Sequence, residues 1–474
     1  MSNVLLSSIG SGIYNKENKS KKYYTANYVL GDDKEKEVIS AYIYDALIEF
    51  RKIDKIIFIG TAGSNWFLMY EHLFDESSKI KPILEKDEAY AETLLELNEA
   101  KPVPKNPANI DKNKTHPNLD VKEVREKLQK LKDTMGDICM DIIVLHYGIT
   151  EEEMNDNFKL LAEAKRLIKE DDNLSFDMTH SFRSLAFYEL LALNFFKLSM
   201  KNSKNIDFIS YGMLEYNSYN EGKTPIIDQS PILRLLEWTK AADEYKRFGT
   251  TYLIDELINK EEMTYGVDRE ACLALGRLGD MVTSNNLDEI RNMVSNCHKI
   301  VEKGTTGNHA IDFIFKDIDD IFGVALRDEN KLEDRTRLYI KVARWHMEKK
   351  RYIASVITIV ETMLNYCDEI AGVSSENDGE KKELRRALYS NYALGNKVPI
   401  FAEFVINYNK IRELRNKLCH AQKLSNENEL RDLEEYIKKV SDLFEVRLVN
   451  NLSNVEKLSE TIIEVVKQNK ENQG

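Results

Sequence analysis

The sequence predicts an α/β domain built on a largely parallel sheet, followed by an all-helical domain. Short apolar runs rich in β-branched residues alternate with helical stretches through the first half of the 474-residue chain. Seven of the eight prolines lie at or before Pro231, so the second half almost lacks the residue that interrupts helices. The length suits two or three domains. We therefore expect a sheet with helices first, and helices alone afterwards.

Five runs in the first half are the expected strands, because each is apolar and ends in small or polar residues. They are 4–12, 55–65, 141–148, 174–181 and 206–212. Their continuous apolar character is typical of strands that are buried on both faces.

Helices are expected between these strands, for example over residues 35–51, 150–169 and 184–200. The second of these has Thr150 and Glu153 at the spacing of a capping box. Strands that alternate with helices predict a parallel sheet with right-handed crossovers, which is a Rossmann-like arrangement.

The domain boundary is expected near residue 235. Residues 1–235 form the predicted sheet domain, in which 101–118 is rich in proline and asparagine and indicates an exposed loop or insertion. Residues 236–474 form the predicted helical domain, where 337–370 shows the apolar spacing of amphipathic helices.

Composition limits the classes of function that fit this chain. Its 67 basic and 80 acidic side chains give a net charge of −13, which disfavours nucleic-acid binding over the whole surface and requires a small, focused site instead. No apolar window is long enough to span a membrane, and the first residues do not resemble a signal peptide. The five cysteines are scattered, so we expect a cytoplasmic protein without disulfides or a metal site.

The ends of the predicted strands carry the candidate ligand-binding residues. Ligands of open α/β sheets bind beyond the carboxyl ends of the strands, where backbone N–H groups and helix N-termini suit anions. The candidates are Gly10, Ser11, Gly12, Thr61, Ser64, Asn65, Thr179, His180, Ser181 and Arg183. Turn geometry alone explains the glycines. It does not call for aspartate, threonine, histidine and arginine within residues 177–183, so a ligand site is favoured there.

A predicted helix near the C-terminal end carries the candidate catalytic residues, in the stretch 412–421. Ile411, Leu414 and Leu418 form an apolar stripe at about 100° per residue, whereas Arg415, Asn416 and His420 lie off it. A histidine can take the 2′-hydroxyl proton of RNA or protonate the leaving oxygen, and an arginine can stabilise charge on the phosphorane.

A second pair with similar spacing, Arg291 and His298, lies in an amphipathic stretch without other polar clustering. We interpret that pair as part of a solvated helix face.

The two halves together resemble the CRISPR-associated CARF–HEPN ribonucleases of type III systems. FDMTHSFRSL (176–185) and SSIGSG (7–12) resemble the pattern of the Rossmann-like CARF domain, and 224–238 is similar to the family's passage from sensor to effector. Arg415, Asn416 and His420 match the Arg-Asn-x-x-x-His motif of the helical HEPN domain.

The resemblance implies a homodimer whose CARF domains bind a cyclic oligoadenylate, and we favour the tetra-adenylate over the hexa-adenylate. Binding would switch on metal-independent cleavage of single-stranded RNA in antiviral defence, without a cofactor. Arg415 and His420 would be catalytic and Asn416 would support them. The positions that match the family's ligand-facing ones are Ser11, Thr61, Thr179, His180, Ser181 and Arg183.

Two alternatives remain open at this point. The chain could be a non-catalytic nucleotide sensor whose helical domain binds a partner. The sensor domain could also degrade its cyclic ligand slowly, through His180 or nearby hydroxyls. Dimerisation would bring two Arg/Asn/His sets into one cleft, where residues that diverge on one helix can converge.

Overall fold

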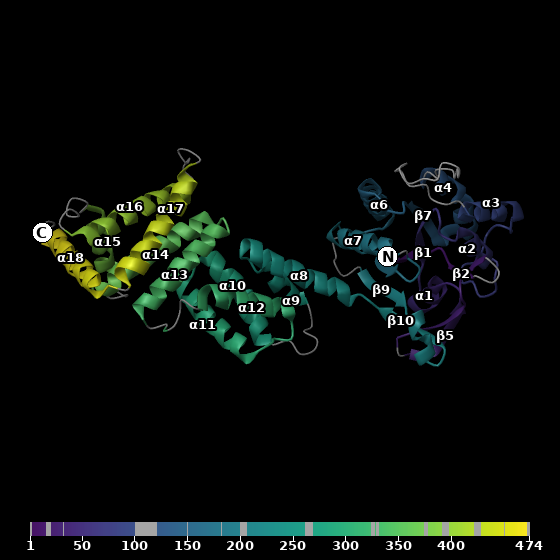
Figure 1. The fold of residues 1–474 in the computed structure, drawn as a ribbon, viewed down its shortest axis with the longest axis horizontal. Helices are drawn as coiled ribbons and strands as arrows, with labels where there is room; N and C mark the ends of the chain where they lie inside the picture. The colour runs from purple at the N-terminus through teal and green to yellow at the C-terminus, as the bar shows by residue number, and fades with distance from the viewer. Residues whose placement is uncertain are drawn as a thin grey trace. The chain divides into compact units, whose positions relative to one another are not determined.

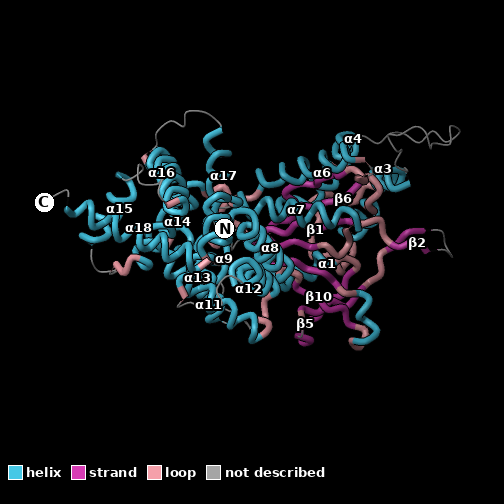
Figure 2. Tube along the Cα trace, turned by 60° about the vertical axis from the view of Figure 1, so that its left-hand side comes forward, coloured by secondary structure: helices cyan, strands magenta, loops and turns pink. Residues whose placement is uncertain are grey.

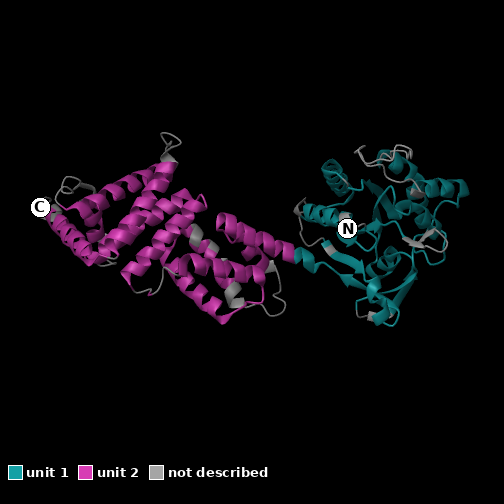
Figure 3. Ribbon diagram, viewed as in Figure 1, with its two compact units in different colours: residues 1–234 teal, residues 235–474 magenta. Residues whose placement is uncertain are grey.

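The computed structural model divides into two compact units, residues 1–234 and 235–474 (Figure 3). The described residues are 2–15, 20–31, 33–99, 121–148, 150–181, 183–199, 206–260, 269–323, 328, 331–373, 378–390, 398–420, 428–449 and 451–471. The predicted insertion 101–118 lies outside them.

All described strands belong to the first unit, where they are drawn in magenta in Figure 2. They are β1 (Asn3–Ile9), β2 (Ile13–Asn15), β3 (Ser20–Lys22), β4 (Ala26–Leu30), β5 (Asp33–Ser40), β6 (Lys55–Thr61), β7 (Cys139–Leu145), β8 (Asn173–Asp177), β9 (Ile206–Gly212) and β10 (Lys223–Asp228). Eight of them form one sheet in the order β5-β4-β10-β9-β8-β1-β6-β7, and β2 and β3 form a separate hairpin.

Five neighbouring strands of this sheet, from β9 to β7, are parallel and coincide with the five predicted runs. β10 pairs antiparallel with β9 and parallel with β4, and β5 closes the edge antiparallel to β4. The sheet is therefore mixed, with a parallel Rossmann-like core as predicted.

The helices of the first unit cover both faces of the sheet. They are α1 (Ile43–Arg51), α2 (Trp66–Leu73), α3 (Glu88–Glu99), α4 (Val121–Lys127), α5 (Gln129–Met135), α6 (Glu151–Ala164) and α7 (Arg183–Ser199). Figure 1 shows α6 and α7 on one side and α2 and α3 on the other. Leu5 of β1 packs into the core on the face of the sheet that α1 to α5 cover. Its neighbours Val4 and Leu6 point to the opposite face and are also buried, so β1 is covered on both faces.

One predicted helix of the first unit is half wrong. Residues 35–51 were expected to be helical, but residues 35–40 belong to β5 and the helix α1 begins only at Ile43. The alternating charged residues of β5 suit an exposed edge strand, and its pairing with β4 is a contact that local pattern does not reveal. The capping box is confirmed, because the Thr150 side chain accepts from the Glu153 N–H at the start of α6.

The second unit contains helices and no strand among its described residues, as the proline distribution predicts. Its helices are α8 (Pro231–Phe248, which begins at the end of the first unit), α9 (Tyr252–Lys260), α10 (Arg269–Ser284), α11 (Leu287–Lys303), α12 (His309–Phe322), α13 (Leu332–Glu348), α14 (Tyr352–Ile370), α15 (Asp378–Ser390), α16 (Pro399–Cys419), α17 (Asn428–Asp442), the π-helical η8 (Leu443–Leu448) and α18 (Leu452–Glu471). None of the described helices is long and apolar enough to cross a membrane.

Two apolar cores fill this helical unit. The first contains side chains of α8 to α13, including Trp238 and Phe315. The second contains side chains of α13 to α18, including Ile359, Phe404 and Phe444. The helix α16, which carries the candidate catalytic residues, belongs to the second core.

Candidate functional site

A cavity of about 470 Å³ lies at the carboxyl ends of β1, β8 and β9. Six predicted ligand-binding residues line it, and seven residues that were not predicted complete its wall. The lining residues are Gly10, Ser11, Gly12, Thr179, His180, Ser181, Tyr23, Tyr24, Tyr28, Tyr211, Gly212, Leu214 and Glu215. Two strand ends that are far apart in sequence thus meet at one site, as the topology of a parallel sheet requires.

Gly10 must be a glycine for the two loops to meet. A Cβ atom at this position would lie 2.4 Å from the backbone oxygen of His180. The Gly10 carbonyl accepts from the Tyr23 hydroxyl at 2.6 Å and from the Asn65 N–H at 2.7 Å. The first loop of the cavity is therefore held from both sides.

Three predicted residues lie behind this wall and do not line the cavity. Thr61, Ser64 and Asn65 are almost completely buried. The Ser64 hydroxyl donates to Ile9 O at 2.5 Å and accepts from Thr61 N at 2.8 Å. Asn65 caps α2 by accepting from Leu68 N. Their polar groups shape the turn after β6, which braces Gly10.

The second loop is organised by Asp177, which ends β8 and is fully buried. Its carboxylate accepts from the Ser7 hydroxyl at 2.8 Å and from the Thr179 hydroxyl at 2.6 Å. Burial raises the Asp177 pKa to about 6, although these hydrogen bonds act to lower it. The Thr179 hydroxyl also accepts from the Gly212 N–H at 2.9 Å, so it joins β8 to β9 at the cavity floor.

A second buried carboxyl, Glu189 of α7, lies beneath the same loops. It accepts from the Ser8 hydroxyl at 2.7 Å, and Ser181 also hydrogen-bonds to it. Burial raises the Glu189 pKa to about 7, although both hydroxyls oppose the shift. Arg183 begins α7, but its side chain lies outside the described parts of the structure.

His180 presents a neutral ring to the cavity. Its ring stacks edge-on against Tyr23, with centroids 5.0 Å apart, and lies near Tyr42 at 5.9 Å. Burial lowers its pKa to about 4, and its buried Nε2 has no hydrogen-bond partner among the described residues. The imidazole can therefore stack on a ligand at neutral pH, but it brings no positive charge to the pocket.

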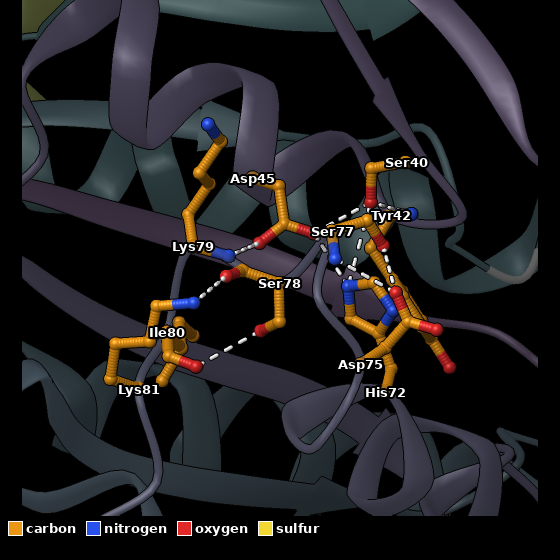
Figure 4. Close-up of polar contacts among 10 residues, drawn as sticks. All are labelled: Ser40, Tyr42, Asp45, His72, Asp75, Ser77, Ser78, Lys79, Ile80 and Lys81. Atoms are coloured by element: carbon orange, nitrogen blue, oxygen red, sulfur yellow. Dashed lines mark hydrogen bonds and ion pairs between the residues drawn. The ribbon is translucent and has the colours of Figure 1, made fainter.

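A separate cluster of serine, aspartate and histidine lies in the first unit, between β5, α1 and α2 (Figure 4). Ser40 and His72 Nε2 both bond Oδ2 of Asp45 at 2.6 Å, and Lys79 N donates to its Oδ1 at 2.8 Å. A nucleophilic triad needs the histidine between serine and carboxylate. Here one ring nitrogen, His72 Nε2, faces both the Asp45 carboxylate at 2.6 Å and the Ser40 hydroxyl at 3.5 Å, so the cluster is not a triad and instead ties three segments together.

The candidate catalytic residues lie at the C-terminal end of α16. Ile411 is fully buried and Leu414 nearly so, as the predicted apolar stripe requires. The Arg415 guanidinium donates to the Asn416 side-chain oxygen at 3.1 Å. His420 is exposed and caps the helix. Its backbone N–H donates to the backbone carbonyl oxygen of Asn416 at 3.0 Å.

Arg291 and His298, the other Arg/His pair, each contact acidic side chains of their own. His298 Nδ1 lies 3.0 Å from Asp319 and its Nε2 3.4 Å from Glu302. Arg291 contacts Asp288 at 3.5 Å. His298 thus lies on the polar helix surface that the sequence indicates, whereas Arg291 is half-buried.

Residues 4–215 match the family model described as CRISPR system endoribonuclease Csx1, CARF domain. The first unit is a CARF domain. Residues 234–325, at the start of the helical unit that follows this CARF unit, match the model described as CRISPR-associated protein MJ1674, second domain. The CRISPR-associated protein MJ1674 of Methanocaldococcus jannaschii is 28% identical over 498 residues, which cover 100% of this chain and 70% of that protein.

A solved structure, Enterococcus italicus Csm6 bound to cyclic hexa-2′-fluoro-hexa-dAMP, is similar over 98% of this chain and 100% of its own. The identity is 10% and the TM-score 0.39, a likeness too low to support a conclusion about this chain.

The sequence did not reveal the tyrosines of the CARF pocket. Tyr23 follows the β2–β3 hairpin, Tyr28 lies in the missed strand β4, and Tyr211 precedes the end of β9. Of these tyrosines, only Tyr211 could have been proposed as a pocket residue from the sequence, because it lies near the end of a predicted strand. Glu215, which accepts from the Tyr211 hydroxyl at 3.2 Å, follows that strand closely.

Proposed function

We propose that the chain is an antiviral endoribonuclease, and that a cyclic oligoadenylate bound in the CARF pocket switches it on. The observation that carries the proposal is the pocket itself. It brings the 10–12 and 179–181 loops together at the carboxyl edge of a CARF sheet. Ring-shaped ligands with repeating phosphates fit two copies of such a pocket in a homodimer.

The lining of the pocket indicates how a phosphate would be bound. None of the described lining residues is a lysine or arginine. Phosphate oxygens would therefore meet backbone N–H groups of the two loops and the hydroxyls of Ser11 and Ser181, near the start of α7. The tyrosines offer faces on which adenine bases can stack. Thr61, Ser64 and Asn65 would act indirectly, by holding Gly10 in place.

The proposed nuclease site is formed by Arg415, Asn416 and His420 in a helical unit of HEPN type. His420 is exposed, so its imidazole can reach an RNA strand and exchange a proton with the 2′-hydroxyl or the leaving oxygen. Arg415 would stabilise negative charge on the phosphorane. Asn416 holds the guanidinium through its side-chain oxygen. We propose that two copies pool these groups in one cleft and need no metal.

The test is cleavage of labelled single-stranded RNA in EDTA, with and without cyclic tetra- or hexa-adenylate. We expect cleavage that depends on the activator and is lost in His420→Ala. His298→Ala is the matched control and should retain activity, because His298 is engaged with Asp319 and Glu302. Full cleavage by His420→Ala contradicts the proposed site. Ligand binding without any RNA turnover favours a non-catalytic sensor instead.

A further inference from the structure

Helix α16 carries a stripe of side chains that contains Arg415 of the Arg/Asn/His motif and extends beyond the motif towards the start of the helix. Tyr408, Arg412 and Arg415 are spaced by four and three residues, which places them within about 60° of one another on a helix. The ring of Tyr408 is packed into the second core, with 3% of the residue exposed. The two guanidinium groups therefore follow one line along the helix, and Arg412 lies about one turn before the proposed catalytic arginine.

Helix α15 brings a third arginine to the same place. Leu384 and Leu388 of α15 are buried in the core that contains Tyr408. The Asn409 side chain donates to the carbonyl oxygen of Leu388 at 3.5 Å, which fixes α15 beside the middle of α16. Arg385 lies between the two leucines in sequence and is exposed.

Electrostatics agree with this placement. Burial raises the Tyr408 pKa, and the charges of Arg412, Arg385 and Arg415 all oppose that shift. Three guanidinium groups from two helices thus act on one phenol. The neighbouring carboxylate is Asp368, on which Lys381 and Arg385 act. Glu361 also acts on Asp368, so two carboxylates lie near four cations, and the surface is still locally positive on a chain whose net charge is −13.

Such a surface suits the backbone of RNA. The planar fork of arginine binds phosphate oxygens in pairs, and phosphate contacts hold a strand in position without reading its sequence. We infer that Arg385 and Arg412 bind phosphates of single-stranded RNA next to the bond that is cleaved, so that this face of α15 and α16 is the substrate-binding surface. The inference rests on the proposed nuclease function and adds two positioning residues to it.

The experiment measures RNA binding without cleavage. Full-length His420→Ala protein, saturated with cyclic tetra-adenylate, is titrated into a fluorescent single-stranded RNA at several salt concentrations. Arg385→Gln and Arg412→Gln should each weaken binding about 3- to 10-fold. Each should also lower the slope of log K against log salt by about 0.7, because one phosphate contact is lost.

Arg386→Gln is the matched control. It removes the same charge from the next position of α15, where the guanidinium bonds Glu383 at 2.8 Å. We expect its RNA affinity and salt slope to equal those of the parent. Arg385→Lys keeps the charge and should recover part of the lost affinity. Far-ultraviolet circular dichroism of each variant shows whether its helices are retained.

The possible failures are distinguishable. If RNA binds to Arg385→Gln and Arg412→Gln as tightly as to the control, with equal salt slopes, the inference is overturned and the nuclease proposal stands. If the activated parent binds no RNA and the wild type cleaves none, the nuclease proposal fails, and the inference with it.

Discussion

The hydroxyl of Tyr23 donates a hydrogen bond of 2.6 Å to the carbonyl oxygen of Gly10. The bond joins the residue after the β2–β3 hairpin to the first loop of the CARF pocket, while the same ring contacts His180 of the second loop. Tyr23 is thus the side chain that contacts both loops at once. Binding of the proposed ligand should depend on it.

Tyr23→Phe tests this dependence. The variant keeps the ring contact with His180 and loses a hydrogen bond worth about 1 kcal/mol, so we expect about 5-fold weaker binding of cyclic tetra-adenylate. Isothermal titration calorimetry measures the affinity. Tyr219→Phe, at a position that is 81% exposed and outside the pocket lining, should bind normally. Equal affinities of the two variants would show that the bond does not position the loop.

Gly10→Ala should damage the pocket more severely. Its methyl group would meet the His180 carbonyl oxygen at 2.4 Å, and backbone atoms of two packed loops must move apart. We expect a loss of about 1–3 kcal/mol of unfolding free energy, as for other overpacked sites, together with loss of nucleotide binding. Thermal and urea unfolding measure the first quantity, and calorimetry the second.

The control for this variant is Gly31→Ala. Among the described residues no atom lies within 4 Å of a Cβ at Gly31, although its φ of +58° makes a small backbone cost unavoidable. Nucleotide binding should be unchanged there. Tight binding by Gly10→Ala would mean that the loops do not meet as the structure has them.

The buried carboxyl of Glu189 predicts a pH dependence of stability. Burial raises its pKa to about 7 from an ordinary value of 4.5, so the folded protein holds this proton more tightly than the unfolded chain does. Stability should therefore fall as the pH rises from about 4.5 through 7, and the full penalty applies above that range. Asp177, with its pKa raised to about 6, acts in the same direction.

Glu189→Gln removes one of these two ionisations and retains a carbonyl oxygen for Ser8. We expect the free energy of unfolding of the variant, compared with that of the wild type, to be higher at pH 8 than at pH 5. Unfolding by urea across this range measures the difference. Glu126→Gln, at an exposed position of α4, should follow the wild type at every pH. A constant difference between Glu189→Gln and the wild type would contradict the assignment.

The parallel core of the sheet could be predicted from sequence because burial on both faces leaves a local signal. Strands such as β1 and β6 are buried at nearly every position, and their apolar runs end in glycine and hydroxyl residues. The edge strand β5 has no such signal. Lys36 and Glu37 are exposed, and only pairing with β4 makes this charged stretch a strand.

The candidate site was predictable at the level of loops, but not of side chains. Ser11 and Ser64 are the same residue type beyond neighbouring strands, yet Ser11 lines the pocket and Ser64 bonds Ile9 behind it. The direction of a hydroxyl depends on the turn that surrounds it, which sequence spacing does not specify. Tyr23 was missed for a related reason, because a hairpin returns it to the pocket after the strand has ended.

The contact between Arg415 and Asn416 predicts that Asn416 acts on the chemical step. Asn416→Ala removes the oxygen that accepts from the guanidinium at 3.1 Å, so Arg415 would stabilise the transition state less well. We expect kcat for RNA cleavage to fall about 10-fold, with KM almost unchanged, because a contact that matters in the transition state affects kcat first. Cys419→Ser changes an exposed, uncharged neighbour on the same helix end and should keep wild-type kinetics. Steady-state cleavage of labelled RNA with saturating activator measures both constants. A rise in KM without loss of kcat would instead assign Asn416 to substrate binding.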